Sequence, residues 1–429
     1  MRYCARCLYP ENSRPTIIFD DEGVCSGCRY HESRMNLEIN WDDRHKMLGE
    51  ILEDARKLAR SRGNSHDCIV PVSGGKDSHY QVWLLKKKYG LNPLLVFFNH
   101  VYNNPAGLKN IENLTAKSGC DVIIYTAGVD AVRRVSRHML ETVGDLTWHY
   151  HAGIRTVPFQ IAVAYNIPLI VWGEHGFAEL TGIVSLEDFV EFTRWTRKEH
   201  DMRGYEPEDL IGKGGITLGD VRPYIYPSDE EIQRTELRGI YLSNFTYWDA
   251  KKQAETMIAE WGFNTVTYKR DRTFNLYAKL DDHANDVHDY LKYLKFGYGR
   301  ATDDASMEIR HGRLTREEGQ QLVKEYDANE PTSLEYYCDF LGLKKKDFYG
   351  LVESMRDSKI WSKHGGEWQA TDAVWRHPVT PAMEKFRPKQ SEDRTFAPKN
   401  RQLYYNPALP PVPSGNPDLD RKSAAFRVL

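Results

Sequence analysis

The residues with the clearest chemical potential form one run, Ser73-Gly74-Gly75-Lys76-Asp77-Ser78. Two glycines let the backbone approach anionic oxygens, and free amides at the start of a helix favour negative charge there. The serines add hydroxyl donors, and the lysine adds a point charge. Asp77 is unusual in an anion site and fits better as a helix cap or as a residue that positions magnesium. The run therefore predicts a phosphate cradle.

Two common phosphate loops are excluded. The Walker pattern requires Ser or Thr after its lysine, whereas Lys76 is followed by Asp77, and the Gly-x-Gly-x2-Gly fingerprint is also absent. A plain glycine turn before an ordinary helix remains the alternative. The apolar run 68–72, which leads directly into the glycines, favours the phosphate cradle.

Four of the seven cysteines form two Cys-x2-Cys pairs, Cys4 with Cys7 and Cys25 with Cys28. This spacing predicts a four-thiolate zinc site, which is coordinatively closed and therefore structural. Two disulfides, free thiols or a redox pair are the alternatives, and redox use would need an accessible thiol of low pKa. An odd number of cysteines in a large chain indicates a reducing compartment, so we expect a cytoplasmic protein.

Several elements must position these residues. Short apolar runs at 68–72, 93–99, 121–126 and 168–172 alternate with helix-like segments. This order predicts the α/β class, with a doubly wound, mainly parallel sheet. Ligands of such sheets bind at the carboxyl ends of the strands.

Three polar spots fall at those ends: the run 73–78, then Asn99 and His100, and then residues 173–176. Glu174 and His175 are candidates for binding magnesium or substrate. For His100 and His175 an ordinary polar loop residue is an equally good interpretation.

The run 73–78 resembles the PP-loop of N-type ATP pyrophosphatases, which cleave ATP between its α- and β-phosphates. The resemblance implies ATP and Mg²⁺ as cofactors, with pyrophosphate lying on the loop. It also implies that Asn99 and His100 line the adenine and ribose. Gly173 and Glu174, after the fourth strand, would then lie near the reacting phosphate.

The second half carries another dense group of charges. Val287, Leu291 and Leu294 share one helix face, and Lys292 and Lys295 lie beside it. A glycine-containing break at 297–300 follows, and cations and carboxylates alternate up to residue 313. We predict an anion-handling loop here, with a solvated helix end held by salt bridges as the alternative.

These motifs together define a narrower resemblance. The four cysteines, SGGKDS, WGEHG and KYLKFGYGRATDDASMEIRHGRLTREEG, in this order, resemble the N-acetyl sugar amidotransferases of surface-polysaccharide biosynthesis over roughly residues 3–345. In that family an acetamido group on a nucleotide-linked or acidic sugar becomes an acetamidino group, for O-antigen or another surface glycan. The resemblance therefore implies an ATP-dependent carbon–nitrogen ligase.

The chemistry follows from the poor reactivity of an amide. ATP converts the carbonyl oxygen into an adenylate, and ammonia attacks the imidate carbon as AMP leaves. We expect residues 73–76 and Ser78 to hold the phosphates, with magnesium offsetting their charge. The catalytic candidates are Lys76, Asp77, Glu174, Lys295 and Arg300.

Ammonia needs a source, and a glutaminase needs an activated cysteine. Cys68, Cys120 and Cys338 lie in apparent strands or a helix without a nucleophile-elbow pattern, and residue 2 is Arg. We predict that this chain has no glutaminase of its own. The resemblance implies a separate partner, similar to the glutaminase and cyclase subunits of histidine biosynthesis.

Composition limits the partners. The chain has 429 residues, a formal charge of −3, and no apolar run of about 20 residues that could cross a membrane. We therefore expect neither membrane nor nucleic-acid binding. The expected organisation is a zinc ribbon at 1–40, a PP-loop domain at 41–185, an insertion, possibly substrate-binding, at 186–270, a helical region completing the active site at 271–370, and a Pro-rich extended tail at 371–429.

Two other functional classes remain open. A tRNA-thiolating PP-loop enzyme can also carry a zinc ribbon, but it would need cysteines near the loop and a basic RNA-binding face. A non-catalytic zinc-ribbon adaptor would leave the run 73–78 unexplained.

Overall fold

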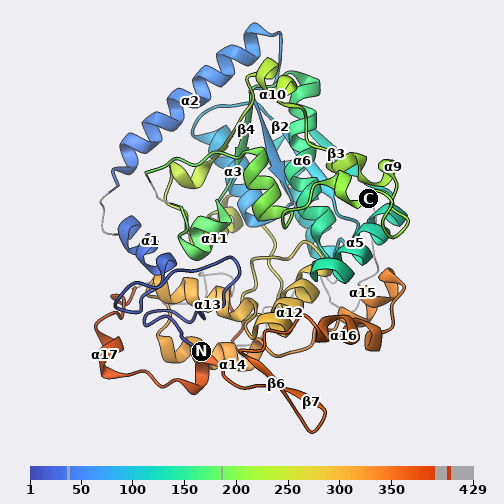
Figure 1. Ribbon diagram of the computed structural model, residues 1–429. Helices are drawn as coiled ribbons and strands as arrows, with labels where there is room; N and C mark the ends of the chain where they lie inside the picture. The colour runs from blue at the N-terminus through green and yellow to red at the C-terminus, as the bar shows by residue number, and fades with distance from the viewer. Residues whose placement is uncertain (36–38, 185–186, 392–402, 407–429) are drawn as a thin grey trace.

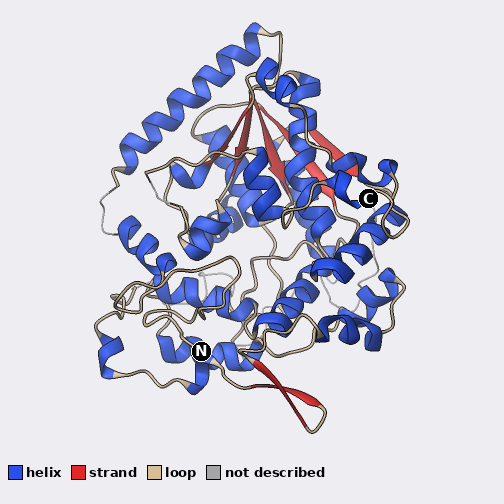
Figure 2. Cartoon of the chain, in the orientation of Figure 1, coloured by secondary structure: helices blue, strands red, loops and turns tan. Residues whose placement is uncertain are grey.

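A five-stranded parallel sheet organises the larger part of the chain in this computed structural model, which describes residues 1–35, 39–184, 187–391 and 403–406. The strands are β1 (Cys68–Val72), β2 (Pro93–Asn99), β3 (Val122–Thr126), β4 (Leu169–Trp172) and β5 (Arg238–Tyr241). Their order is β3-β2-β1-β4-β5, with Ile69 opposite Ile170 where β1 meets β4. The predicted parallel α/β sheet is confirmed, and Figure 2 shows its strands fanning through the upper half of the molecule.

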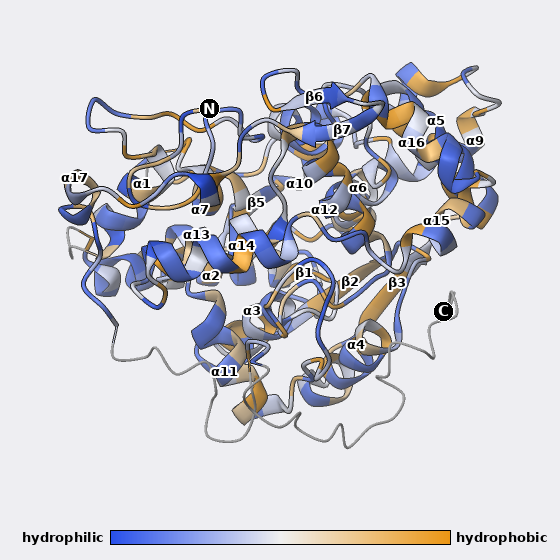
Figure 3. Cartoon of the chain, turned by 90° about the horizontal axis from the view of Figure 1, so that it is seen from below, coloured by the Kyte–Doolittle hydropathy of each residue, from blue (hydrophilic) through white to orange (hydrophobic). Residues whose placement is uncertain are grey.

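Both faces of the sheet are covered by helices, which explains why its strands are apolar without alternation. Ile69, Phe98 and Ile170 belong to the core on one face, whereas Val70 and Val171 belong to the core on the other. In Figure 3, α3 (Lys76–Lys87), α4 (Pro105–Ser118) and α11 (Ala250–Trp261) lie on one side of β1–β3. α6 (Trp148–Tyr165) and α12 (Ala284–Phe296) lie on the other side.

The remaining elements frame this sheet. They are α1 (Ser26–Met35), α2 (Trp41–Ser61), α5 (Val129–Val143), α7 (Gly176–Thr181), α8 (Arg194–Thr196), η1 (Arg197–Asp201), η2 (Pro207–Leu210), α9 (Leu218–Val221), η3 (Arg222–Tyr224), α10 (Asp229–Thr235), η4 (Leu242–Asn244), α13 (Arg300–Arg310), α14 (Arg316–Tyr326), α15 (Leu334–Leu341), α16 (Lys345–Glu353), β6 (Trp361–His364), β7 (Glu367–Ala370), η5 (Val374–Arg376) and α17 (Pro381–Glu384). Figure 1 places α12–α16 together below the sheet. None of the described helices is long and apolar enough to cross a membrane.

The segment 186–270, expected to be an insertion, contributes β5 to the sheet through pairing with β4. The region 271–370 is mainly helical but ends in the antiparallel hairpin β6–β7, which turns at Gly365 and Gly366. Its helices also share their cores with the sheet, since Leu291 packs into one core and Ile309 into the other. The C-terminal helices therefore form one packed body with the sheet.

The N-terminal residues form a small metal-ribbon-like unit whose core includes the four cysteines, Tyr9 and Val24. It lies beside α13 in Figure 1, and α1 contacts both α13 and α7. The predicted tail at 371–429 is described only in part, because residues 392–402 and 407–429 lie outside the described residues. Its described part packs on the body: Phe386 joins the core of the ribbon, and Leu403 is fully buried.

Candidate functional site

The glycine loop 73–78 lies where the order of the sheet reverses. β1 has β2 on one side and β4 on the other, and the loops after β1 and β4 therefore leave the sheet at the point where ligands of open α/β sheets commonly bind. The loop after β1 carries Lys76 and Asp77, and Glu174 follows β4. Adjacent parallel strands thus bring together candidates that are about 100 residues apart.

The backbone of the loop is held open by its serines and by Gly74. The Ser73 amide donates to the Ser78 hydroxyl at 2.9 Å, and the Gly75 amide donates to the Ser73 hydroxyl at 3.3 Å. Gly74 has φ +83°, and a Cβ there would lie 2.8 Å from the backbone nitrogen of Ile111. Only glycine fits this conformation and this close approach.

Helix α3 starts at an N-cap, Gly75, without a side-chain cap. Helix α13 also starts at a glycine, Gly299, but there the Asp327 carboxylate accepts hydrogen bonds from the amides of Gly299 and Ala301. The start of α13 is therefore neutralised from within the protein, whereas the start of α3 remains available to an anion. The segment 297–313 is therefore not the predicted loop over most of its length: it is the capped helix α13, and several of its charges are paired, as in Arg300–Asp289 and Arg313–Glu308.

Six charged side chains, which we call the charge cluster, are connected by electrostatic interactions that begin at the loop. The cluster comprises Lys76, Asp77, Glu174, Lys279, Arg300 and Asp304. Lys76 is buried, and its ammonium lies 2.6 Å from the Asp77 carboxylate. Burial opposes the charge of Lys76, but Asp77 and Glu174 raise its pKa above the ordinary value.

Two carboxyl groups of the charge cluster are perturbed by burial. Burial, with the nearby Asp77 carboxylate, raises the pKa of Glu174 to about 7, although Lys76 acts in the opposite direction. Burial likewise raises the pKa of Asp304 to about 6 against the effect of Arg300. Asp77 and Glu174 together offer the oxygen ligands that Mg²⁺ prefers beside a phosphate loop. Their mutual repulsion is the electrostatic cost that a bound cation would remove.

The sequence analysis missed Lys279. It is exposed and has φ +54°, and its ammonium forms no hydrogen bond or ion pair with any described residue. Desolvation by the surrounding protein lowers the pKa of its ammonium, and the nearby Arg300 adds to this effect. An unpaired lysine in a strained backbone conformation, beside Glu174 and Arg300, is suited to bind an anionic ligand.

Arg300 and Lys295 occupy different surroundings. Arg300 forms a two-pronged pair with Asp289 at 2.8 and 2.9 Å and lies within the charge cluster. Lys295 instead donates to the carbonyl of Gly144 at 2.8 Å, and its electrostatic neighbours are Asp145 and Arg203. Burial lowers the pKa of Lys295 to about 8. Lys295 is therefore not brought together with Lys76.

Three other candidates have structural roles. Asn99 accepts from the Val101 amide at 3.1 Å and from the Asn103 side chain at 2.6 Å, so it organises the turn after β2. At Gly173 a Cβ would lie 2.1 Å from the Gln81 side chain, so this glycine allows β4 to pack closely on α3. His175 caps α7 by accepting from the Ala178 amide.

His100 follows Asn99 and is 2% exposed. Neither of its ring nitrogens has a hydrogen-bond partner among the described residues. It lies beside Asp281 and Asp282.

The four cysteines of the ribbon meet at one point. Their sulfurs lie within 4.8 Å of one another, with 3.9 Å between Cys4 and Cys28 and 3.6 Å between Cys7 and Cys25. A tetrahedral site with Zn–S bonds of about 2.3 Å requires sulfur–sulfur edges of about 3.8 Å, whereas a disulfide requires about 2.05 Å. The residues present therefore fit a four-thiolate metal site and not two disulfides.

Two arginines attach this site to the C-terminal helices. The Arg310 guanidinium lies 3.6 Å from the Cys25 sulfur, where it offsets thiolate charge. Arg316 donates to the carbonyls of Cys4 and Cys7. Tyr9 adds a 2.9 Å hydrogen bond to Asp303 on α13, the helix that carries Arg300 and Asp304.

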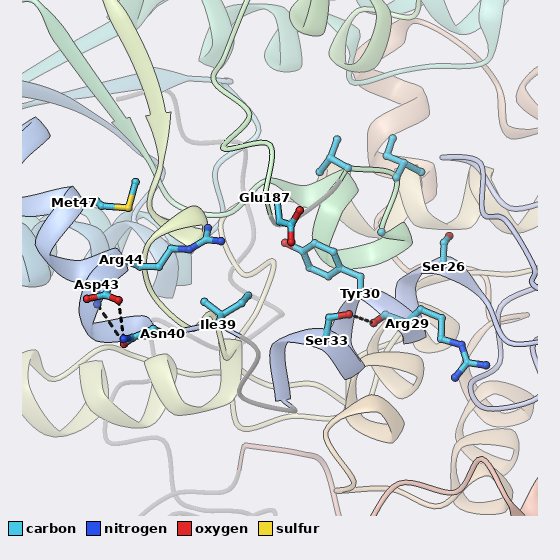
Figure 4. A pocket seen from close by; sticks show the side chains of 13 residues that line it. Ser26, Arg29, Tyr30, Ser33, Ile39, Asn40, Asp43, Arg44, Met47 and Glu187 are labelled. Atoms are coloured by element: carbon cyan, nitrogen blue, oxygen red, sulfur yellow. Dashed lines mark hydrogen bonds between the residues drawn. The ribbon is translucent and has the colours of Figure 1, made fainter.

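A pocket of about 610 Å³ lies between α1 and α2. It is lined by Tyr30 and Arg29 from α1, Arg44 and Met47 from α2, and residues 182–184 (Figure 4). Its lining contains none of the predicted site residues.

Comparisons with known proteins cover parts of the chain. Residues 264–374 match the family described as LPS biosynthesis protein WbpG-like, C-terminal domain. An uncharacterized protein of Methanocaldococcus jannaschii is 29% identical over 156 residues, which are 34% of this chain and 54% of that protein. The chain thus spans about half the length of this curated relative.

Three solved structures are similar at 13% identity. The NH3-dependent NAD synthetase of Campylobacter jejuni matches 46% of this chain and 93% of its own, with a TM-score of 0.27. The NMN synthetase of Francisella tularensis matches 46% and 94%, with a TM-score of 0.26. The U34-tRNA thiolase of Methanococcus maripaludis matches 60% and 82%, with a TM-score of 0.23.

Proposed function

We propose, from the premise that residues 264–374 are a WbpG-like C-terminal domain of the LPS biosynthesis type, that this chain is an ATP-dependent amidotransferase of surface-glycan synthesis. It converts the acetamido group of a nucleotide-linked or acidic sugar into an acetamidino group. The observation that carries the proposal is the uncapped start of α3, whose first turn carries Lys76 and Asp77 of the charge cluster. The matched C-terminal domain supplies three of the six members of the charge cluster, Lys279, Arg300 and Asp304. The proposed site therefore uses residues from both parts of the chain.

The residues of the loop hold the triphosphate. The amides at the start of α3, the Ser73 and Ser78 hydroxyls and the Lys76 ammonium bind the β- and γ-phosphates, which leave as pyrophosphate. Asp77 and Glu174 would hold Mg²⁺, which offsets phosphate charge and makes the leaving group better. Burial of Lys76 strengthens its attraction for the leaving group, because less water screens it.

The acetamido oxygen attacks the α-phosphorus, and the bond between the α- and β-phosphates breaks. The product is an imidate–AMP. Ammonia then adds to the imidate carbon, AMP leaves with the former carbonyl oxygen, and loss of a proton gives the neutral amidine. Lys279 and Arg300 stabilise negative charge that develops on the α-phosphate.

Ammonia comes from a separate glutaminase in this proposal. The cysteines outside the ribbon are all buried, and burial raises the pKa of the Cys68 thiol, so it is a poor nucleophile. Cys68 also starts β1, at the opposite end of the strand from the loop. The same placement disfavours tRNA thiolation, which needs a reactive sulfur at the loop.

The test is ATP–pyrophosphate exchange with candidate acetamido sugars, compared with bulk tRNA. We expect exchange that depends on an acetamido sugar and is lost in Lys76→Ala. Lys86→Ala is the matched control, because Lys86 lies in the last turn of the same helix and should leave exchange intact. Exchange stimulated only by tRNA would overturn the proposal, and so would wild-type exchange in Lys76→Ala.

A further inference from the structure

Beside the charge cluster, three side chains from two distant segments form what we call the His–Asp–Asp group: His100, Asp281 and Asp282. One potential ligand atom from each lies within 4.8 Å of the others. His100 Nε2 is 3.8 Å from Asp282 Oδ2, which is too long for a hydrogen bond. The spacing leaves room for an ion between the side chains.

The His100 ring packs against other rings but makes no hydrogen bond with the described residues. It is 2% exposed, and both ring nitrogens lack hydrogen-bond partners among the described residues. The rings packed nearby belong to Phe97, Tyr102 and Tyr150, with centroids 5.5–6.4 Å away. A buried imidazole with two unsatisfied nitrogens is costly, and an ion bound by one nitrogen would reduce that cost.

The backbone holds the two segments side by side. The His283 amide donates to the Tyr102 carbonyl at 3.0 Å, and the Asn104 amide donates to the Asp281 carbonyl at 3.2 Å. A Cβ at Gly107 would lie 2.2 Å from that carbonyl oxygen, so the start of α4 also fits closely here. These contacts fix the positions of the three side chains before any ligand binds.

Asn285 orients both carboxylates. Its amide donates to Asp282 Oδ1 at 2.7 Å, and its side chain donates to Asp282 Oδ2 at 3.0 Å and to Asp281 Oδ1 at 3.2 Å. Such contacts commonly orient the ligands of metal sites, and each carboxylate oxygen keeps lone pairs for a second interaction.

Two neighbouring carboxylates, one of them with a fully buried side chain, repel each other, and a cation between them would remove that cost. Lys279 interacts with both through space but forms no ion pair with either among the described residues. The charge of the pair is therefore not neutralised by direct contact within the described protein.

We propose that His100, Asp281 and Asp282 bind a divalent transition-metal cation. One imidazole with two carboxylates suits Mn²⁺, Fe²⁺, Co²⁺ or Zn²⁺ better than Mg²⁺, which prefers oxygen ligands alone. Three protein ligands leave positions open for water or substrate. This site is separate from the thiolates of the ribbon and from the oxygen ligands Asp77 and Glu174.

The test is a titration of the full-length chain, with the ribbon loaded with zinc and with nucleotide and Mg²⁺ absent. Mn²⁺ binding is followed by electron paramagnetic resonance, and pulsed measurements detect coupling to an imidazole nitrogen. We expect a bound Mn²⁺ with nitrogen coupling. His100→Gln should abolish the coupling, and both His100→Gln and Asp282→Asn should weaken binding by at least about 10- to 100-fold.

Two controls make the result specific. His283→Gln changes a neighbouring histidine outside the group and should leave Mn²⁺ bound with its coupling. Asp77→Asn should also keep the nitrogen-coupled Mn²⁺. An ion held at the phosphate loop would instead be lost in that variant and would show no nitrogen coupling.

Circular dichroism checks that each variant folds, and Asp281→Asn, at a partly exposed position, replaces any variant that does not fold. Absence of nitrogen-coupled Mn²⁺ in the wild type, or unchanged binding in His100→Gln, would refute the site.

Discussion

Glu174 should make the ligand-free protein less stable as the pH rises. Its pKa is about 7 in the folded protein, against an ordinary value of 4.5. The folded state therefore keeps the proton to a higher pH than the unfolded state does. Stability associated with this group is fully present below pH 4.5, falls between pH 4.5 and 7, and stays reduced above pH 7.

The magnitude follows from that difference. At about 1.4 kcal/mol for each pH unit, the loss reaches about 3 kcal/mol above pH 7. This value is an upper bound, because the side chain is partly exposed and solvent screens its interaction with Asp77. Glu174→Gln removes the titrating group. We therefore expect this variant to be more stable than wild type at pH 8, by up to about 3 kcal/mol, and similar to wild type at pH 4.5.

The assay is urea unfolding of wild type and Glu174→Gln at both pH values, without nucleotide or added metal. Glu179→Gln is the matched control, because Glu179 forms a buried 2.6 Å ion pair with Arg34. Losing that partner should destabilise the protein at pH 8, by about 3–5 kcal/mol. If Glu174→Gln is as stable as wild type at pH 8, or less stable, the electrostatic account of the charge cluster is wrong. The same variant should lose exchange activity, since it loses a magnesium ligand.

Three further changes test the site. Gly74→Ala forces a side chain into a left-handed conformation at a cost of about 1–2 kcal/mol and against Ile111, so calorimetry should show at least about tenfold weaker ATP binding. Gly90→Ala, strained but with open space around it, should destabilise without this loss. Cys25→Ser should lower both the metal content, measured by mass spectrometry, and exchange. Lys279→Ala should reduce exchange by about 100-fold, and an equal loss in Lys295→Ala would contradict the placement of Lys295 outside the cluster.

Buried strands were the most predictable part of the fold. The bounds of β1 and β2 coincide with the predicted runs. A strand covered on both faces is a nearly continuous apolar run, so its length can be read from the sequence. β5 escaped prediction because its four residues include Arg238 and Gly239, and Gly239 is needed where the strand packs against Phe159 and Phe192. The hairpin β6–β7 could have been predicted from its Gly365-Gly366 turn.

The site was most predictable where a local pattern carries it, although Glu174 and Arg300, from other segments, were also predicted and lie in the charge cluster. The loop 73–78 and the four cysteines are local patterns, and the structure places each set together. Lys279 and Asp282 have no periodic signal, because their positions depend on backbone pairing with residues 102–104. Lys295 was chosen for its place in a basic run. The turn of α12 instead directs it to Gly144, away from the loop.

The ribbon contacts both of the distant segments that carry members of the charge cluster. On one side, the Ser26 hydroxyl donates to the Thr181 carbonyl, and Arg34 pairs with Glu179, so α1 holds the segment that follows Glu174. On the other side, the Leu8 amide donates to Ser306 on α13, at 3.3 Å.

A unit of this size has too small a core to fold alone, so we expect it to depend on a bound metal. A metal bound by the four thiolates would then stabilise the contacts that the ribbon makes with both α7 and α13, near the site where we propose that ATP reacts. A closed thiolate site that takes no part in the chemistry would then still be required for it. The loss of exchange in Cys25→Ser should accordingly be larger than the loss of overall helix content.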